Sequence, residues 1–187
     1  MNQIKFRTIE EASSLPFVPT TREHLEQVRK DIAFVKYGNA SRLAKVRRIY
    51  QAADLLTSEI SPMAVCSQGC GSCCHIDVDV TEIEALYIEK NSGHKVRPGR
   101  SRTNGHGDRK TPCCFLSSTQ ICTIYECRPF ACRTHFAFDD PKFCSEIDVD
   151  HVTYDARGNP YLTELAAILF ELNGSAPPRD IRDFFEP

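Results

Sequence analysis

The stretch best suited to chemistry runs from Cys66 to Cys74 and places four thiols within nine residues. Thiolates are soft ligands that suit zinc, copper(I) and iron–sulfur clusters. Two glycines in the stretch allow the backbone to take positive φ and to turn its N–H groups toward the sulfurs. Cys66, Cys70 and Cys73 have the C-x3-C-x2-C spacing that also occurs where three thiolates hold a [4Fe–4S] cluster. The spacing therefore predicts a metal or cluster site in this loop.

The fourth thiol of the stretch, Cys74, follows Cys73 directly. Adjacent side chains of an extended segment point in opposite directions and rarely chelate one ion together. The stretch can therefore serve two sites, or one site and a buried or resolving thiol. A second segment supplies three more candidate ligands, Cys113, Cys122 and Cys132. The sequence thus predicts a site built from two halves.

The ligand pattern leaves two kinds of metal open. All-cysteine zinc sites usually pair two Cys-x2-Cys knuckles, and this chain has one, from Cys70 to Cys73. A [4Fe–4S] cluster accepts a C-x3-C-x2-C run and one distant cysteine. We therefore expect an iron–sulfur cluster, with [4Fe–4S] as its leading form and zinc as the alternative.

The composition indicates a globular protein of 187 residues with ten cysteines and a net charge of −2. A chain of this length can bury a sizeable core. The N-terminus shows no apolar h-region of a signal peptide, and no window approaches the roughly 20 apolar residues of a membrane span. We therefore expect a cytoplasmic protein without a membrane partner, in which reduced thiols favour metal binding over disulfides.

Residues 1–65 are expected to form an N-terminal arm and a helical hairpin packed on the cysteine core. Thr20 and Glu23 fit a capping box at the start of the first helix, which should stop near Gly38. Ser41 can begin the second helix, and the Ser-Pro pair at 61–62 should end it.

Residues 66–187 are expected to form the cysteine-cluster domain and its C-terminal helices. Alternating polar and apolar residues predict short strands over 76–80 and 121–125. One helix is predicted to follow a capping box at Thr81 and Glu84, and two more are predicted over residues 162–172 and 179–185. Residues 94–112 should form an exposed loop. The predicted fold class is α+β: a small, metal-centred domain with short strands, flanked by helices.

The spacing of the cysteines and their neighbours also carries a resemblance. The pattern reads Cys66-x3-Cys70-x2-Cys73-Cys74, Cys113-x-Phe115-Leu116, Cys122-x-Ile124-Tyr125 and Arg128-Pro129-x-x-Cys132-Arg133. Over residues 66–136 the chain resembles the YkgJ family of cysteine-cluster proteins, whose domain is described as zinc- or iron-chelating. The resemblance implies metal ligands among Cys66, Cys70, Cys73, Cys74, Cys113, Cys122 and Cys132.

Within that set, the loop plus the Arg-Pro-x-x-Cys turn gives a lead quartet of Cys66, Cys70, Cys73 and Cys132. Cys74, Cys113 and Cys122 follow, as a second site or as exchangeable ligands. The three remaining cysteines depart from the family pattern and are expected to be dispensable: Cys114, Cys127 and Cys144. Arg128 and Arg133 should offset the negative charge of the thiolates. His75 and His135 adjoin the cysteines and are expected to lie outside the ligand set.

These observations leave three functions to compare. The first is an accessory protein that handles electrons or metal for a protein partner. The second is a structural-zinc interaction module, in which nucleic acid could contact the basic residues Arg42, Lys45, Arg47 and Arg48, although we interpret these as a solvated face. The third is a cluster-dependent enzyme that modifies proteins, because a relative of the domain occurs in flagellin lysine methylases, which look like iron–sulfur proteins. The sequence does not decide whether the protein is an enzyme, and we favour the first function.

Overall fold

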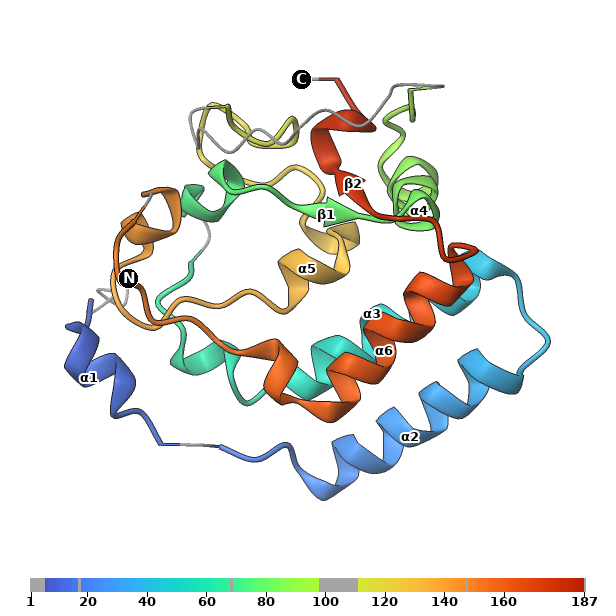
Figure 1. The fold of residues 1–187 in the computed structure, drawn as a ribbon, viewed down its shortest axis with the longest axis horizontal. Coiled ribbons are helices and arrows are strands. Elements are labelled where there is room, and N and C mark those ends of the chain that lie inside the picture. Colours follow the sequence, from blue (N-terminus) through green and yellow to red (C-terminus); the bar gives the residue numbers. More distant parts are fainter. Residues whose placement is uncertain (1–5, 17, 68, 98–110, 147, 187) are drawn as a thin grey trace.

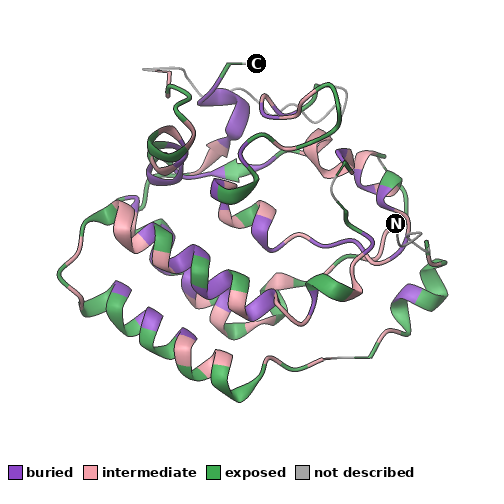
Figure 2. Ribbon diagram, turned by 180° about the vertical axis from the view of Figure 1, so that it is seen from behind, coloured by how far each residue is buried: buried purple, intermediate pink, exposed green. Residues whose placement is uncertain are grey.

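Three helices that run side by side enclose the larger apolar core of this computed structural model, which describes residues 6–16, 18–67, 69–97, 111–146 and 148–186 (Figure 1). They are α2 (Arg22–Tyr37), α3 (Arg42–Thr57) and α6 (Pro160–Leu172). Figure 2 shows buried residues along the edge of α2 that faces the other two helices, and exposed residues along the opposite edge. The amphipathic helices expected in the N-terminal region are therefore present.

The first of these helices begins one residue later than predicted. Thr21, and not Thr20, is the N-cap, and its side-chain oxygen accepts a hydrogen bond from the backbone N–H of His24 at 3.2 Å. The hydroxyl of Thr20 instead donates to the backbone carbonyl of Leu56 at 3.3 Å. This contact with α3 takes the hydroxyl away from the cap. The helix ends before Gly38, as predicted.

The second helix begins as predicted and ends earlier. Ser41 is its N-cap and accepts a hydrogen bond from the backbone N–H of Ala44 at 3.2 Å. The helix stops at Thr57, and a separate 3-10 turn, η1 (Ser61–Met63), contains the proline that was expected to end it. The hairpin of α2 and α3 packs against α6, and α3 also packs against α4 and α5 of the cysteine-rich part of the chain.

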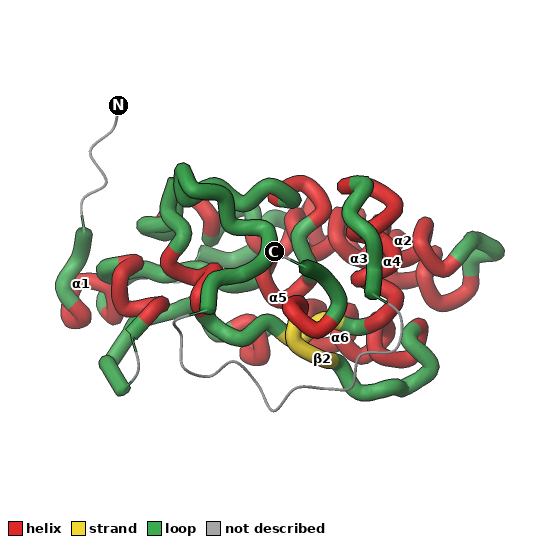
Figure 3. The backbone as a smooth tube through the Cα atoms, turned by 90° about the horizontal axis from the view of Figure 1, so that it is seen from above, coloured by secondary structure: helices red, strands yellow, loops and turns green. Residues whose placement is uncertain are grey.

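Shorter elements surround this three-helix layer. They are α1 (Ile9–Ser13), α4 (Glu82–Ser92), α5 (Phe130–Arg133), η2 (Ser72–His75), η3 (Tyr125–Cys127), η4 (Pro141–Ser145), η5 (Ala156–Gly158) and η6 (Ile181–Asp183). Seen from above, many of the segments outside the helices are loops (Figure 3). No helix in the described ranges combines the length and apolar content needed to cross a bilayer.

A two-stranded antiparallel sheet joins the middle of the chain to its C-terminal part. It consists of β1 (Asp79–Val80) and β2 (Arg179–Asp180), with Asp79 opposite Asp180. The strand predicted over 76–80 is thus reduced to its last two residues. The described residues therefore combine helices with a small sheet, which agrees with the predicted α+β class.

Two predicted elements are wrong. The segment 179–185 was expected to be a helix, but it begins as β2 and continues as a 3-10 turn, because pairing with β1 uses backbone groups that a helix would need. The segment 121–125 makes a single bridge, between Cys122 and Leu116, in place of a strand. The backbone N–H and the hydroxyl of Thr123 both donate to one carbonyl, that of Phe115, at 2.9 and 3.1 Å, so the segment folds back locally.

The predicted exposed loop falls largely on residues 98–110, which lie outside the described residues. At the edge of that gap, the backbone N–H of Arg97 donates to the carbonyl of Phe184 at 2.9 Å, and its guanidinium lies 2.9 Å from the carboxylate of Glu186.

The capping box predicted for α4 is present, and its glutamate also joins three helices. One carboxylate oxygen of Glu84 accepts a hydrogen bond from the backbone N–H of Thr81 at 3.0 Å. The other oxygen accepts from the hydroxyl of Tyr50 on α3 at 3.0 Å and from the backbone N–H of Phe130 on α5 at 2.8 Å. Burial, and then the charge of Glu84, raise the pKa of Tyr50 well above its usual range. With only 2% of its surface exposed, Glu84 is a buried polar connection between α4, α3 and α5.

We expect Glu84→Ala to lower the free energy of unfolding by about 2–4 kcal/mol, because the hydroxyl of Tyr50 and the backbone N–H groups of Thr81 and Phe130 lose their acceptor. Denaturant unfolding measures the change. Glu82 lies on the exposed side of the same helical turn, so Glu82→Ala is the control and should cost less than about 1 kcal/mol. Equal losses at the two positions would show that Glu84 acts only as an N-terminal helix charge.

Candidate metal centre

The first cysteine loop is held against the segment that follows α5. The backbone N–H of Val65 donates to the carbonyl of Ala137 at 2.9 Å, and the N–H of Ala137 lies 3.4 Å from the sulfur of Cys66. The turn η2, which carries Cys73 and Cys74, packs closely against η4, which carries Cys144. The loop therefore faces a part of the chain about seventy residues away in sequence.

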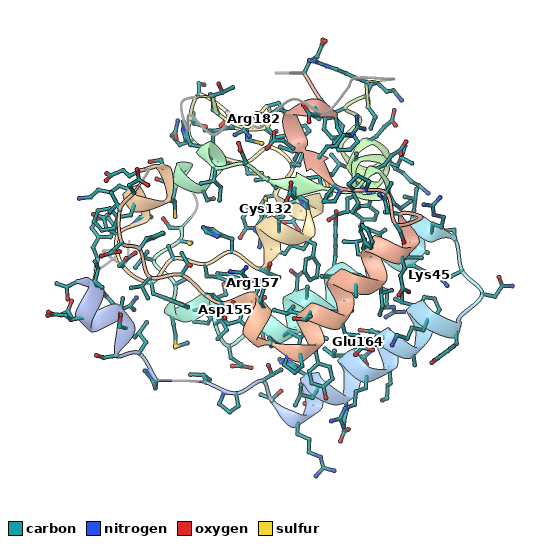
Figure 4. All side chains as sticks on the ribbon, in the orientation of Figure 1. Lys45, Cys132, Asp155, Arg157, Glu164 and Arg182 are labelled. Atoms are coloured by element: carbon teal, nitrogen blue, oxygen red, sulfur yellow. The ribbon has the colours of Figure 1, made fainter. Side chains whose placement is uncertain are left out.

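Six thiols belong to or pack against the smaller apolar core, and four of them are in the predicted ligand set. We call these four the sheet-side thiols: Cys74, Cys113, Cys122 and Cys132. The backbone N–H of Cys113 donates to the carbonyl of Cys74 at 2.7 Å, which fixes the second segment beside the first. Cys132 lies on α5, between the sheet and the three-helix layer (Figure 4). All four pack on the smaller apolar core, beside side chains such as Phe115 and Phe184.

The electrostatic surroundings of Cys132 include several other thiols. Burial raises the pKa of Cys132 well above its usual range, and the thiolates of Cys73, Cys113 and Cys122 raise it further. Cys122 shows the same effect, because burial and then repulsion by Cys113 raise its pKa. Separate thiolates in this space repel one another, whereas a shared metal cation would stabilise all of them.

Cys73 lies between the sheet-side thiols and a second set. The S–H of Cys74 donates to its sulfur and, with the Arg128 cation, lowers the pKa of Cys73 to about 7. The same hydrogen bond raises the pKa of Cys74. Cys114 donates in the same way to Cys113, so the pKa of Cys113 falls and that of Cys114 rises.

The second set, which we call the loop-side thiols, consists of Cys66, Cys70 and Cys144. Burial raises the pKa of Cys144 to about 12, and the thiolates of Cys73, Cys66 and Cys70 add to the shift. Two imidazoles contact Cys144: the Nε2 atom of His151 at 3.0 Å and that of His135 at 3.6 Å. The sequence analysis placed Cys144 and His135 outside the ligand set and did not single out His151 among the histidines.

Two arginines adjoin the cysteines, and Arg128 has the more direct influence on the pKa values of the thiols. Its cation lowers the pKa values of Cys73 and Cys122 and opposes the upward shift at Cys132. Its Nε is buried and has no hydrogen-bond partner within the described ranges. Arg133 was expected to serve the same purpose, but it forms two contacts to the carboxylate of Asp54, at 2.7 and 3.0 Å. Arg133 therefore connects α5 to α3, and Arg128 is the cation available to an anionic centre.

Arg182 ties the two cysteine segments together and was missed by sequence reasoning. Its guanidinium donates to the carbonyl of Cys74 at 3.3 Å and to those of Ile76 and Thr111 at 3.2 and 3.0 Å. Asp180 holds the same guanidinium through contacts of 2.9 and 3.0 Å. The arginine is 6% exposed, and it makes these contacts from η6, on the opposite side of the sheet from Cys132 in the view of Figure 4.

We expect Arg182→Met to destabilise the protein by about 3 kcal/mol and to weaken metal retention, because several buried carbonyls and the Asp180 carboxylate lose their donor. Thermal unfolding and the metal-to-protein ratio after dialysis measure the two effects. Arg157 is fully exposed and makes one loose ion pair, of 3.9 Å, with Asp155 (Figure 4), so Arg157→Met is the control. A stable Arg182→Met protein with unchanged metal retention would show that the clamp is unnecessary.

The basic residues of α3 contact other parts of the chain. The guanidinium of Arg48 lies 3.3 Å from the carboxylate of Asp31 and stacks on the ring of Phe34. Arg42 donates to the backbone carbonyl of Leu172. These intramolecular contacts agree with the interpretation of the run as a surface feature of the fold.

The arrangement has the donors of a metal centre without being already closed around an ion. No disulfide joins any of the ten cysteines, all of which lie in the described residues. Within the described ranges, no three Cys, His, Asp or Glu side chains surround a point where a metal ion would fit. The donors are nevertheless of the kind and number that zinc or an iron–sulfur cluster requires. Binding would therefore draw together side chains that already lie close.

The comparison with known proteins agrees with this arrangement. Residues 65–152 match the family model CxxCxxCC, described as "Putative zinc- or iron-chelating domain". No curated protein and no solved structure gives a significant match to the chain. The family match confirms the resemblance to the cysteine-cluster proteins and supports metal binding by this part of the chain.

Proposed function

We propose that the CxxCxxCC domain of this chain holds an iron–sulfur cluster through the sheet-side thiols and serves as an accessory protein in electron or metal handling. The observation that carries the proposal is the half-buried Arg128 side chain, whose Nε is buried without a hydrogen-bond partner in the described structure and whose charge acts on several thiols. A buried polar atom without a hydrogen bond is costly. Four thiolates around iron and sulfide form an anionic centre, which would give this Nε an acceptor.

The proposed ligands are Cys74, Cys113, Cys122 and Cys132, with Cys73 beside them. This differs from the lead quartet expected from spacing, because Cys66 and Cys70 belong to the loop-side thiols. When bound, an iron–sulfur cluster would supply one-electron transfer. The chain contributes thiolates, the charge of Arg128 and an apolar surrounding, and these are the features that tune such a centre.

A redox role is supported by the surface above the site. Ile121 and Tyr125 flank Cys122 and are 37% and 58% exposed, and the guanidinium of Arg128 stacks 3.8 Å from the Tyr125 ring. A centre behind these side chains would lie within a short distance of a docked protein. We therefore propose a protein partner rather than nucleic acid, and a cytoplasmic location that keeps the thiols reduced.

Zinc is the second candidate. The sheet-side thiols number four, without an imidazole or carboxylate among them, and four thiolates also complete a tetrahedral structural zinc site. In that case the domain would be an interaction module in which zinc stabilises short and irregular segments. The protein-modifying enzyme remains a third proposal by family analogy.

Purification under anaerobic conditions separates the first two candidates. The iron–sulfur proposal expects a brown protein with broad visible absorption and with iron and acid-labile sulfide in equal amounts. Reduction by dithionite should bleach the absorption. A colourless protein that contains zinc and no sulfide would overturn the cluster and support the zinc module.

A further inference from the structure

A group of four side chains on the loop side stands apart from the sheet-side thiols. Cys144 is 4% exposed, and its sulfur contacts Nε2 of His151 at 3.0 Å and Nε2 of His135 at 3.6 Å. Both imidazoles thus direct the same nitrogen toward one sulfur. The three side chains come from η4 and from the loops on either side of it.

The fourth member, Asp139, is fully buried behind His151. One carboxylate oxygen lies 2.6 Å from Nδ1 of His151, and the other accepts a hydrogen bond from the backbone N–H of Val152 at 2.8 Å. Neither Oδ1 of Asp139 nor Nδ1 of His151 makes a hydrogen bond of regular geometry within the described residues. A metal on Nε2 would place the imidazole proton on Nδ1, opposite the carboxylate, and carboxylates orient metal-bound histidines in this way.

We propose that Cys144, His135 and His151 are ligands of a separate metal site, which takes zinc or a similar borderline divalent transition ion, and that Asp139 orients His151. The contact distances support this donor set. With Zn–S of about 2.3 Å and Zn–N of about 2.0 Å, a tetrahedral sulfur and nitrogen lie roughly 3.5 Å apart, close to the 3.6 Å between Cys144 and His135. His151 would move slightly away from the sulfur to admit the ion.

The first cysteine loop supplies the fourth ligand. Cys73 packs against Cys144, Val65 and Ala137 in one small buried cluster. The backbone N–H of Ala137 also contacts the sulfur of Cys66. A thiolate of this loop therefore lies near the proposed ion, and the two thiols that the sheet-side centre does not use, Cys66 and Cys70, remain available.

Cys144, His151 and Asp139 could alternatively be read as a nucleophile, a base and an orienting carboxylate. Reactive cysteines lie in partly exposed, electropositive surroundings. Cys144 is buried, and its neighbours include further thiols. Metal binding fits these surroundings better than nucleophilic catalysis.

This inference rests on the proposed function only in that the domain binds metal, and zinc titration of the full chain tests both separately. The reduced, metal-stripped protein is titrated with Zn²⁺, and the bound equivalents are counted after gel filtration. We expect two equivalents for the natural chain and one for Cys144→Ser or His151→Gln. The matched controls, Cys127→Ser and His24→Gln, should keep two. Zinc-edge X-ray absorption should detect about 2.0 Å Zn–N bonds in the natural chain and fewer in His151→Gln.

The Asp139→Asn variant keeps every proposed ligand. It should bind the second zinc equivalent about 10–100-fold more weakly than the natural chain. Two equivalents in Cys144→Ser and His151→Gln, with sulfur ligands alone in every spectrum, would overturn this inference and leave metal binding by the sheet-side thiols intact. A natural chain that binds no zinc would overturn this inference, and the iron and sulfide content of the anaerobically purified protein tests the sheet-side centre separately. Rapid alkylation of Cys144 in the natural chain, abolished in His151→Gln without loss of zinc, would assign the group to nucleophilic chemistry.

Discussion

Cys132→Ser should empty the sheet-side centre, whereas Cys127→Ser should leave its metal content unchanged. Cys132 is surrounded by Cys73, Cys113 and Cys122, whose thiolates act on its pKa. Cys127 is also buried, at 7% exposure, but the charges that act on its pKa are those of Arg133 and Glu126. Loss of one thiolate in four opens a coordination position, while loss of a buried thiol removes ordinary packing, worth roughly 1 kcal/mol.

The measurement is the ratio of iron, sulfide and zinc to protein in variants purified side by side. Circular dichroism verifies that each variant is folded. Serine variants should fall into two groups, those that lose a whole centre and those that lose none. If the Cys127→Ser protein lacked metal and the Cys132→Ser protein retained it, Cys127 and not Cys132 would be the ligand from this part of the chain.

Removal of the metal should loosen the cysteine-rich part of the protein and leave the three-helix layer folded. The buried side chains of α2, α3 and α6 form a core of their own, which includes Ile49, Leu56 and Leu165. The cysteine segments have two-residue strands and smaller apolar clusters, so they depend more on chelation. A ligand present at a thousandfold excess over its dissociation constant stabilises by about 4 kcal/mol, which corresponds to roughly 10 °C in melting temperature for a chain of this size.

Hydrogen exchange with and without a chelator, in the presence of a reductant, tests this division. Amide protection should fall over residues 65–80 and 111–146 and persist in α2, α3 and α6. The control is Cys132→Ser, which should resemble the stripped protein before any chelator is added. An unchanged melting temperature after complete removal of metal would show that chelation and folding are independent.

The sequence by itself determined the elements whose signals are local. The capping box of Thr81 and Glu84, the N-cap at Ser41 and the end of a helix near Gly38 depend on residues within one or two turns. The cysteine pattern, likewise local, predicted the family and a metal-binding role. The CxxCxxCC match confirms the first and supports the second.

Only the tertiary structure decided which side chains meet. The hydroxyl of Thr20 contacts α3 instead of capping α2, and the segment from Arg179 pairs as a strand because β1 lies next to it. The same long-range contacts place Arg182 between the two cysteine segments and bring His151 to Cys144. Spacing along a chain reports which thiols can share a loop. It cannot report which face of that loop meets a segment seventy residues away, and this determines how the thiols divide into a sheet-side and a loop-side group.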